Sequence, residues 1–160
     1  MTENKIKDIS RLKAITDSLK RQGKKIVFTN GCFDILHRGH IQLLGKAKSL
    51  GDVLVVAINS DSSVKKIKGK KRPINSTINR AVVLSAIEFV DFITIFSEPD
   101  PAKVIKKLHP DILVKGGDWK MDEIVGKDLV ESKGGKVISL PLAKGYSTSH
   151  LIEEIVKRYK

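Results

Sequence analysis

Short runs of β-branched and other apolar residues alternate with amphipathic segments along almost the whole chain, and this alternation limits the possible folds. The apolar runs lie at 25–29, 53–58, 92–96, 112–114 and 137–140. Each run has the length and composition of a strand buried on both faces. Because strands that alternate with helices favour a parallel sheet, we predict an α/β fold with five parallel strands.

The amphipathic segments between the runs predict the helices. They lie at 9–19, 41–50, 78–87, 101–108, 122–133 and 147–159, with Gly23 and Gly51 as helix stops. Helices on both faces of the sheet would make a Rossmann-like three-layer α/β/α sandwich. Since no repeat or linker interrupts the pattern, we expect one domain over 1–160, with an N-terminal helix at about 8–22 and a core at about 24–158.

The cysteine count and the distribution of apolar residues indicate the cellular compartment. Cys32 is the single cysteine, so the chain has no internal disulfide and no multi-cysteine metal site. No apolar run approaches the ~20 residues that cross a bilayer. The N-terminal residues also lack the apolar core of a signal peptide. We therefore expect a cytoplasmic protein with no membrane association.

The chain carries a formal net charge of +12, from 30 Lys and Arg against 18 Asp and Glu, and should attract polyanions. Much of the excess lies in the stretch 65–72, for which a solvated loop is the simplest interpretation. No aromatic residue falls between Asp61 and Glu88, so the stacking that supports single-stranded nucleic-acid binding is missing there. Nucleic acid is therefore an unlikely partner, and a smaller phosphorylated ligand is favoured.

Two histidines mark the junction between the first predicted strand and the helix that follows it. In the stretch NGCFDILHRGH, His37 and His40 surround Gly39. A helix N-terminus has free N–H groups that bind anions, and glycine permits close approach of a phosphate. Structural histidines and a metal-binding pair are alternatives, but HExxH, GxxxxGK[ST] and GxGxxG are all absent. We therefore favour phosphate binding.

Several further motifs follow in order. They are Ala57–Asp61, Lys68-Gly69 with Arg72-Pro73, Arg80, Val114–Trp119 (VKGGDW) and Gly145–Ser149 (GYSTS). Together with the HxGH stretch, they resemble the HxGH nucleotidyltransferase superfamily and its cytidylyltransferase-like branch. Their order is similar to that in D-glycero-β-D-manno-heptose 1-phosphate adenylyltransferases. The resemblance covers roughly residues 24–158.

This resemblance implies transfer of AMP from ATP, with Mg²⁺, to heptose 1-phosphate. The products would be pyrophosphate and ADP-heptose for lipopolysaccharide core or a related glycan. The chain resembles the stand-alone form without a kinase domain, which implies a separate heptose kinase and phosphatase. The family's frequent dimerisation implies a homodimer. A phosphate monoester has a second pKa of ~6, so the acceptor needs no general base. Catalysis instead needs positioned anions and stabilisation of the leaving pyrophosphate.

The resemblance also assigns roles to individual residues, and no protein ligand for a metal is among them. The catalytic candidates are His37, His40, Lys66 and Arg80. The nucleotide-binding candidates are Asn30, Gly31, Phe33, Gly39, His40, Asn59, Asp61, Gly117, Asp118, Tyr146, Ser147, Thr148 and Ser149. The sugar phosphate-binding candidates are Asp34, Arg72, Lys115 and Trp119.

Structural explanations compete with some of these roles. Asn59, Asp61 and the serines and threonine at 147–149 are common helix caps. The basic side chains are also typical of an exposed surface, and Trp119 of a core. Two other functions remain open: a CTP-dependent glycerol 3-phosphate or polyol phosphate cytidylyltransferase, which would share these motifs, and a nucleic-acid-binding module based on the stretch 65–72.

Overall fold

A five-stranded, fully parallel sheet forms the centre of the protein, as predicted. The computed structural model describes residues 2–117, 119–141 and 145–160. The strands are β1 (Ile26–Gly31), β2 (Val53–Asn59), β3 (Phe92–Phe96), β4 (Ile112–Gly116) and β5 (Lys136–Leu140). They lie in the order β3-β2-β1-β4-β5, so the direction of the connections reverses between β1 and β4.

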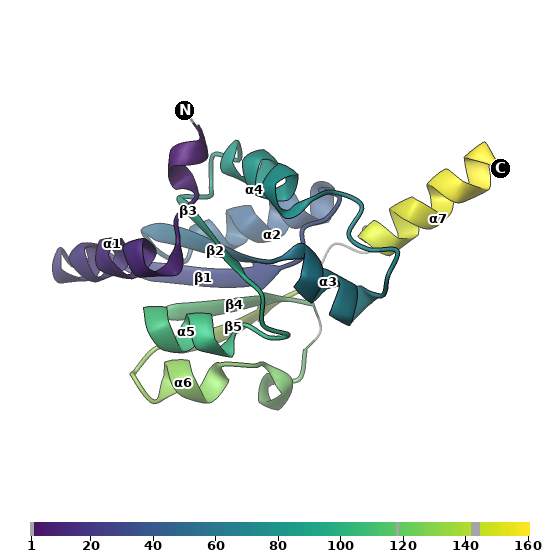
Figure 1. The fold of residues 1–160 in the computed structure, drawn as a ribbon. Coiled ribbons are helices and arrows are strands. Elements are labelled where there is room, and N and C mark those ends of the chain that lie inside the picture. Colours follow the sequence, from purple (N-terminus) through teal and green to yellow (C-terminus); the bar gives the residue numbers. More distant parts are fainter. Residues whose placement is uncertain (1, 118, 142–144) are drawn as a thin grey trace.

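In the part of the chain that the structure describes, seven α-helices and two 3-10 helices connect and flank the strands (Figure 1). The α-helices are α1 (Ile9–Arg21), α2 (Arg38–Lys48), α3 (Asp61–Lys68), α4 (Thr77–Ser85), α5 (Ala102–Leu108), α6 (Lys127–Glu131) and α7 (Thr148–Tyr159). The 3-10 helices are η1 (Thr2–Lys5) and η2 (Met121–Glu123). No helix in these described ranges combines the length and apolar content needed to cross a bilayer.

Two segments differ from the sequence prediction. The first half of the basic stretch belongs to α3, which starts where the Ser60 side chain accepts a hydrogen bond from the Ser63 N–H at 3.3 Å. The predicted helix at 122–133 is divided into η2 and α6. Gly126 separates them with a φ of +91°, and a Cβ there would lie 2.5 Å from Ile105 Cδ1. A left-handed glycine packed this tightly interrupts the helix.

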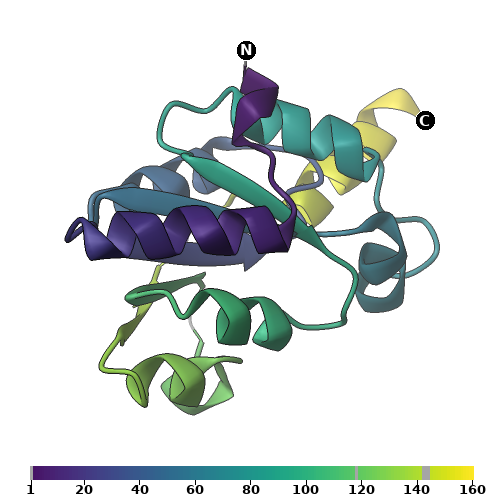
Figure 2. The ribbon, with the colours of Figure 1, turned by 60° about the vertical axis from the view of Figure 1, so that its left-hand side comes forward.

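Helices cover both faces of the sheet, which gives the three layers (Figure 2). On one face, Leu44 of α2 and Leu84 of α4 pack against Leu54 and Val56 of β2. On the other face, Leu12 of α1 and residues of α5 and α6 pack against Phe28 of β1. The residues of β1 and β2 alternate between these two cores, as expected for strands buried on both sides.

Carboxylates hold the N-terminal ends of the central strands. Asp111 Oδ2 accepts a hydrogen bond from the Ile26 N–H at 2.7 Å, and Asp91 Oδ2 accepts one from the Leu54 N–H at 2.7 Å. The side chain of Asp91 also pairs with Lys48 Nζ at 2.5 Å. These contacts satisfy strand N–H groups at the N-terminal edge of the sheet. At the opposite edge, where the strands end, loops run into the N-termini of helices.

Substitution of two glycines, one inside α2 and one just after it, tests how tightly α2 and the turn that follows it are packed. A Cβ at Gly51 would lie 2.7 Å from Val27 Cγ2 and 2.9 Å from the Lys25 carbonyl oxygen. We expect Gly51→Ala to lower the free energy of unfolding by about 1–3 kcal/mol. In contrast, a Cβ at Gly45, inside α2, meets Phe89 at an ordinary 3.5 Å, so Gly45→Ala should raise it by up to about 1 kcal/mol. Urea unfolding of both variants measures the difference, and equal effects would contradict this description of the packing.

Candidate active site

The predicted site residues gather at the carboxyl ends of β1, β2 and β4. β1 lies between β2 and β4, at the point where the connections reverse direction. Ligands of open α/β sheets bind at such a point, because the loops on either side separate there. The loop after β1 leads directly into α2, and α2 begins within the HxGH motif.

His37 caps the N-terminus of α2. Its Nδ1 accepts a hydrogen bond from the Gly39 N–H at 3.1 Å. Burial lowers the pKa of His37, so the ring is neutral at pH 7. Since Nδ1 acts as an acceptor, the proton of the neutral ring lies on Nε2. His37 can therefore stabilise the helix with one nitrogen and donate a hydrogen bond with the other.

His40 stacks on His37 within the first turn of α2. The ring centroids are 3.8 Å apart with 24° between the planes, and the Phe33 ring lies 5.1 Å from His40 on another side. Burial, together with the nearby His37, lowers the pKa of His40 to about 4. Its Nδ1 is buried and has no hydrogen-bond partner among the described residues. The histidine pair is therefore uncharged at neutral pH and holds an unused polar atom.

Tyr146 brings the start of α7 against this pair. A Cβ at Gly39 would lie 3.3 Å from Tyr146 Cβ, and the Tyr146 ring is 6.5 Å from that of His37. The guanidinium carbon of Arg38 lies 5.8 Å from the centroid of the Tyr146 ring. Gly39 therefore allows two chain segments far apart in sequence to approach closely.

α7 begins beside α2, so two helix N-termini meet at the site. Ser147 caps α7 by accepting a hydrogen bond from the His150 N–H at 3.1 Å. The Thr148 hydroxyl donates to the Ile35 carbonyl at 3.2 Å, and Ser149 is exposed. Ser147 thus has the helix-capping role that the sequence offered as an alternative to nucleotide binding. The two converging helix termini also make the region attractive to anions.

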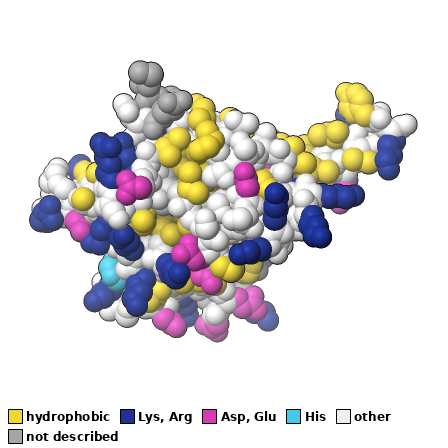
Figure 3. Space-filling view, in the orientation of Figure 1, with side chains coloured by type: hydrophobic (Ala, Val, Ile, Leu, Met, Phe, Trp, Pro, Cys, Tyr) yellow, Lys and Arg dark blue, Asp and Glu magenta, His cyan; other side chains and the backbone are white. Residues whose placement is uncertain are grey.

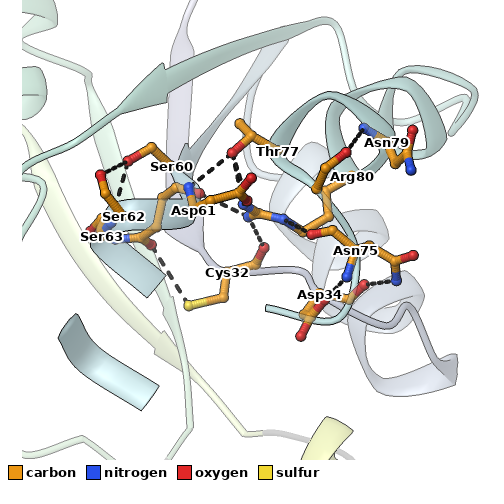
Figure 4. A network of polar contacts seen from close by, with 12 residues as sticks. Cys32, Asp34, Ser60, Asp61, Ser62, Ser63, Asn75, Thr77, Asn79 and Arg80 are labelled. Carbon is orange, nitrogen blue, oxygen red and sulfur yellow. Dashed lines mark hydrogen bonds and ion pairs between the residues drawn. The ribbon is translucent and has the colours of Figure 1, made fainter. Parts of the chain in front are cut away.

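The side chain of Arg80 is fully buried. Figure 4 shows it within a network of polar contacts with Cys32, Asp61 and Asn75. Its Nη1 donates to the carbonyls of Cys32 at 2.7 Å and Asn59 at 2.8 Å, and its Nε donates to the Asn75 carbonyl at 3.0 Å. Its Nη2 donates to Asp61 Oδ1 at 2.8 Å and to the Thr77 hydroxyl at 3.1 Å. All five N–H groups are used within the protein, which leaves none for a substrate and argues against the predicted catalytic role of Arg80.

Asp34, predicted as a sugar phosphate-binding residue, is buried and holds other parts of the chain. Its carboxylate accepts hydrogen bonds from Arg72 Nε at 2.6 Å and from the N–H groups of Ile74 and Asn75 at 2.9 and 2.8 Å. Burial alone would raise the pKa of Asp34, but these donors outweigh it and hold the pKa below its usual value. Asp34 therefore fastens the end of the basic stretch, including Arg72, to the loop after β1.

Asn59 and Asp61 lie at the end of β2 and the start of α3. The Asn59 amide donates to Ser63 Oγ at 2.9 Å, which is a structural contact inside the protein. Asp61 Oδ1 accepts hydrogen bonds from Arg80 and from the Thr77 hydroxyl, and 41% of the Asp61 side chain is exposed. Of the two, only Asp61 is open to a ligand in this arrangement.

A second group of candidates lies after β4. Lys115 Nζ donates to Asn30 Oδ1 at 3.2 Å and lies 5.6 Å from the centroid of the Trp119 ring. Partial burial lowers the pKa of Lys115. Trp119 donates its Nε1–H to the Gly116 carbonyl at 3.1 Å and is 46% exposed, so it is not the core residue considered as an alternative. Gly117 has a φ of +118°, and Asp118 lies outside the described residues.

The remaining candidates differ in their surroundings. Phe33 is buried with a φ of +47°, and a Cβ at Gly31 would lie 3.0 Å from its ring. These two residues shape the loop after β1. Lys66 is exposed on α3. Within the described residues, no group of three or more His, Cys, Asp or Glu side chains could hold a metal ion.

Sequence reasoning missed the contributions of Thr77, Asn75 and Ser63. Thr77 bonds both Asp61 and Arg80, and Asn75 donates through Nδ2 to the Asp34 carbonyl at 2.6 Å. The one signal in the sequence was Ser76 before an apolar run, which predicts that a helix starts there, with Asn75 and Thr77 beside its first turn. Nothing in the local pattern indicated which distant strand ends they would contact.

A separate hollow of about 360 Å³ lies at the opposite edge of the sheet, between α1, the end of α5 and the turn before β5. Two of the lysines that line it, Lys13 and Lys20, have structural partners there. Lys20 Nζ donates to the carbonyls of Leu108 and His109 at the end of α5, and Lys13 pairs with Asp17. This hollow therefore lies apart from the predicted site residues, which gather at the HxGH edge.

Known proteins resemble this chain in sequence and fold. The chain is 48% identical to the bifunctional protein HldE of Geobacter metallireducens over 158 residues, which are 99% of the chain and 32% of that protein. It is 49% identical to HldE of Nitratiruptor sp. over 154 residues, 96% of the chain and again 32% of that protein. The chain thus spans about a third of the length of these relatives.

Solved structures agree with this relationship. The lipopolysaccharide core biosynthesis protein from Thermoplasma volcanium matches with a TM-score of 0.63 and 35% identity over 78% of this chain and 100% of that one. Pantoate-beta-alanine ligase from Francisella tularensis, with a TM-score of 0.64 and 22% identity over 95% and 78%, shares the fold. The family model described as cytidylyltransferase-like matches residues 28–154. The chain therefore belongs to the cytidylyltransferase-like family of nucleotidyltransferases.

Proposed function

We propose that this chain transfers AMP from ATP to D-glycero-D-manno-heptose 1-phosphate and releases pyrophosphate. The observation that carries the proposal is the neutral His37–His40 pair at the N-terminus of α2, where α7 also begins. The VKGGDW and GYSTS motifs support the choice of a heptose phosphate, as does the similarity to the lipopolysaccharide core biosynthesis protein from Thermoplasma volcanium.

The proposed reaction needs no base from the protein. An oxygen of the sugar phosphate attacks the α-phosphorus of ATP, the bond from that phosphorus to the β-phosphate oxygen breaks, and pyrophosphate leaves. The acceptor is largely ionised at pH 7, because the second pKa of a phosphate monoester is ~6. The protein has to align two anions and stabilise the charge on the leaving group.

The histidine pair and the helix N-termini supply that stabilisation. His37 Nε2–H is a donor because Nδ1 is engaged with Gly39. The positive ends of the α2 and α7 dipoles add positive partial charge. Since the His40 ring is largely buried, its hydrogen bond to a phosphate oxygen would form in a medium of low dielectric constant, where it is stronger than in water.

The acceptor and the metal are assigned to other parts of the site. We place the sugar phosphate near Lys115 and the exposed face of Trp119, with Lys66 and Arg72 contributing positive charge from the basic stretch. Asp34 and Arg80 act as positioning residues. Mg²⁺ would arrive with ATP, bound mainly by phosphate oxygens and water, and would neutralise charge on the triphosphate. A separate kinase and a phosphatase would supply the heptose 1-phosphate.

Activity measurements test the substrates first. Pyrophosphate release should require ATP and heptose 1-phosphate together, and CTP with glycerol 3-phosphate should give no turnover. The second pair is the alternative suggested by the cytidylyltransferase-like family match. Turnover with CTP and glycerol 3-phosphate would replace the proposal by that alternative. Absence of turnover, combined with salt-dependent binding of polynucleotides, would favour a nucleic-acid-binding module.

His40→Asn should lower kcat by about 100-fold, because it removes a donor to the transferring phosphates. His109→Asn is the matched control, since His109 lies at the opposite edge of the sheet and asparagine tolerates its left-handed φ of +45°. A kcat for His40→Asn within about twofold of the wild-type value would rule out this role.

The pKa of His40 gives a second, independent test of whether this side chain lies at the bound triphosphate. In the free protein the NMR-measured pKa of His40 should lie well below 6.5, near the value of about 4 expected from its burial. Bound triphosphate favours the charged ring, so ATP should raise this pKa. For the free protein, a folded-state pKa below the unfolded value means that stability falls as pH drops from about 6.5 towards 4. An unshifted His40 in both states would contradict the assignment.

Arg80→Lys tests the positioning role of Arg80. Lysine has three donors from one nitrogen and cannot reach the five acceptors, so we expect the free energy of unfolding to drop by about 3–5 kcal/mol. Arg21→Lys, an exposed change of the same kind on α1, should have no measurable effect. Unfolding by urea compares the two. Wild-type stability of Arg80→Lys with reduced kcat would instead indicate direct contact with substrate.

A further inference from the structure

Arg38 carries a positive charge at a place where its helix disfavours one. It is the first residue of α2, directly after the His37 cap, and it is exposed. The N-terminal end of a helix already has positive partial charge, so a cation in the first turn lowers the stability of the helix. Natural sequences break such a local rule mostly where function requires it.

No acidic group in the described part of the chain neutralises Arg38. Its side chain takes part in none of the ion pairs there, and neither α2 nor α7 has an acidic residue in its first turn. The contact that the structure shows for its guanidinium is with the ring of Tyr146, whose centroid lies 5.8 Å from the guanidinium carbon. The charge of Arg38 is therefore available to an anionic ligand.

Arg11 shows how an arginine in a first turn is balanced elsewhere in this chain. It lies in the first turn of α1 and is exposed. Asp8 caps that helix and accepts hydrogen bonds from the N–H groups of Ser10 and Arg11 at 2.9 and 3.0 Å. The Asp8 carboxylate thus offsets the positive charge of both the helix terminus and the arginine. α2 is capped instead by the uncharged ring of His37, so the charge of Arg38 has no such balance.

A series of contacts leads from the interior of the site to Arg38. The His37 ring stacks on that of His40, with 3.8 Å between centroids, and the Tyr146 ring lies 6.5 Å from that of His37. Arg38 then lies over Tyr146. The inner end of the series, His40, is largely buried, and the outer end, Arg38, is exposed. A triphosphate with one end at His40 would therefore have its other end beside Arg38.

The other positive charges of the protein are more dispersed. Figure 3 shows Lys and Arg side chains spread across the molecule, from α1 on the left towards α7 on the right. Charges spread in this way attract a polyanion from a distance but do not hold it in one position. Burial lowers the pKa of both His37 and His40, so these rings are neutral. Arg38 is thus the residue that gives the HxGH motif a full positive charge.

We propose that the guanidinium of Arg38 binds the β- and γ-phosphates of ATP and holds them as they leave as pyrophosphate; this inference rests on the proposed function. A guanidinium binds two phosphate oxygens at once, and the contact with Tyr146 orients this one before ATP arrives. The bonds that form and break are those of the proposed reaction. Arg38 gives up no proton, because a guanidinium stays protonated, and it stabilises the charge that builds up on the leaving group.

Binding of inorganic tripolyphosphate, measured by titration calorimetry, tests this role without nucleotide or sugar. Arg38→Gln removes the charge but keeps a similar helix propensity, and it should weaken binding by about 10- to 100-fold. Arg11→Gln is the matched control, because it removes the same charge from the first turn of α1, and it should change the affinity by less than about twofold. Wild-type affinity in Arg38→Gln would overturn the proposal. Equal weakening by both variants would also overturn it, because net charge would then govern binding.

The same measurement separates this proposal from the proposed function. If the wild-type protein binds tripolyphosphate and Arg38→Gln binds it equally well, the role of Arg38 is wrong and the proposed reaction is unaffected. If the wild-type protein does not bind tripolyphosphate at millimolar concentrations, the assignment of phosphates to this whole site is wrong, and both proposals fall.

Stability measurements distinguish a ligand contact from a structural role. Arg38→Glu places an acidic residue in the first turn of α2, where the helix dipole favours it. We expect this variant to raise the urea midpoint of the free protein and to abolish tripolyphosphate binding. If Arg38 served to hold Tyr146 in place, the same variant would lower the urea midpoint, because the contact with the ring would be lost. A lowered midpoint would therefore overturn the proposal.

Steady-state kinetics tests whether the contact is with ATP. Arg38→Gln should lower kcat/KM for ATP by about 10- to 100-fold, and Arg38→Lys should recover part of this loss, because lysine keeps the charge without the two-pronged contact. The KM for heptose 1-phosphate should stay within about twofold of the wild-type value in both variants. A raised KM for heptose 1-phosphate with unchanged kcat/KM for ATP would place Arg38 at the acceptor and overturn the proposal.

Discussion

The buried guanidinium of Arg80 connects the parts of the protein on which the active site depends. It binds the carbonyl that follows β1 at Cys32, the carbonyl that ends β2 at Asn59, and the start of α3 at Asp61. A buried cation is stable only where its donors are satisfied and an opposite charge is near, and both conditions hold here. Because the same loop continues through Asp34 to the HxGH motif, the position of the histidine pair depends on this contact and on the one between Asp34 and residues 72–75.

The two edges of the sheet use opposite chemistry. At the N-terminal edge, Asp91 and Asp111 accept hydrogen bonds from strand N–H groups, so donors there are satisfied within the protein. At the carboxyl edge, α2 and α7 present the positive ends of their dipoles, and the His37–His40 pair at the start of α2 is uncharged. The buried charges at this edge, Arg80 and Asp34, are paired within the protein. In the proposed reaction, the imidazole N–H groups and the two helix termini would be the donors that remain for an anion.

Local sequence patterns were sufficient to predict the strands of the sheet and the helix that starts at the HxGH motif. The five strands and the HxGH helix start followed from apolar periodicity and from the spacing of His37, Gly39 and His40, and all five strands are confirmed. α3 was missed because its last turn is basic and because Val64 and Ile67 alone are too few apolar residues to show a helical period. The roles of Arg80 and Asp34 could not be predicted, because charged residues are usually exposed and sequence does not reveal which long-range acceptors or donors will bury them.

The meeting of α2 and α7 has a consequence for selectivity. Each helix terminus alone would bind a small anion weakly, and the uncharged histidines add little attraction at long range. A polyphosphate, in contrast, is long enough to engage both termini at once, and each contact then raises the effective concentration of phosphate at the other. Gly39, which permits the close approach of Tyr146, thereby makes the site sensitive to the length of the anion. Under the proposed function, such a site would bind inorganic phosphate weakly and still retain a nucleotide.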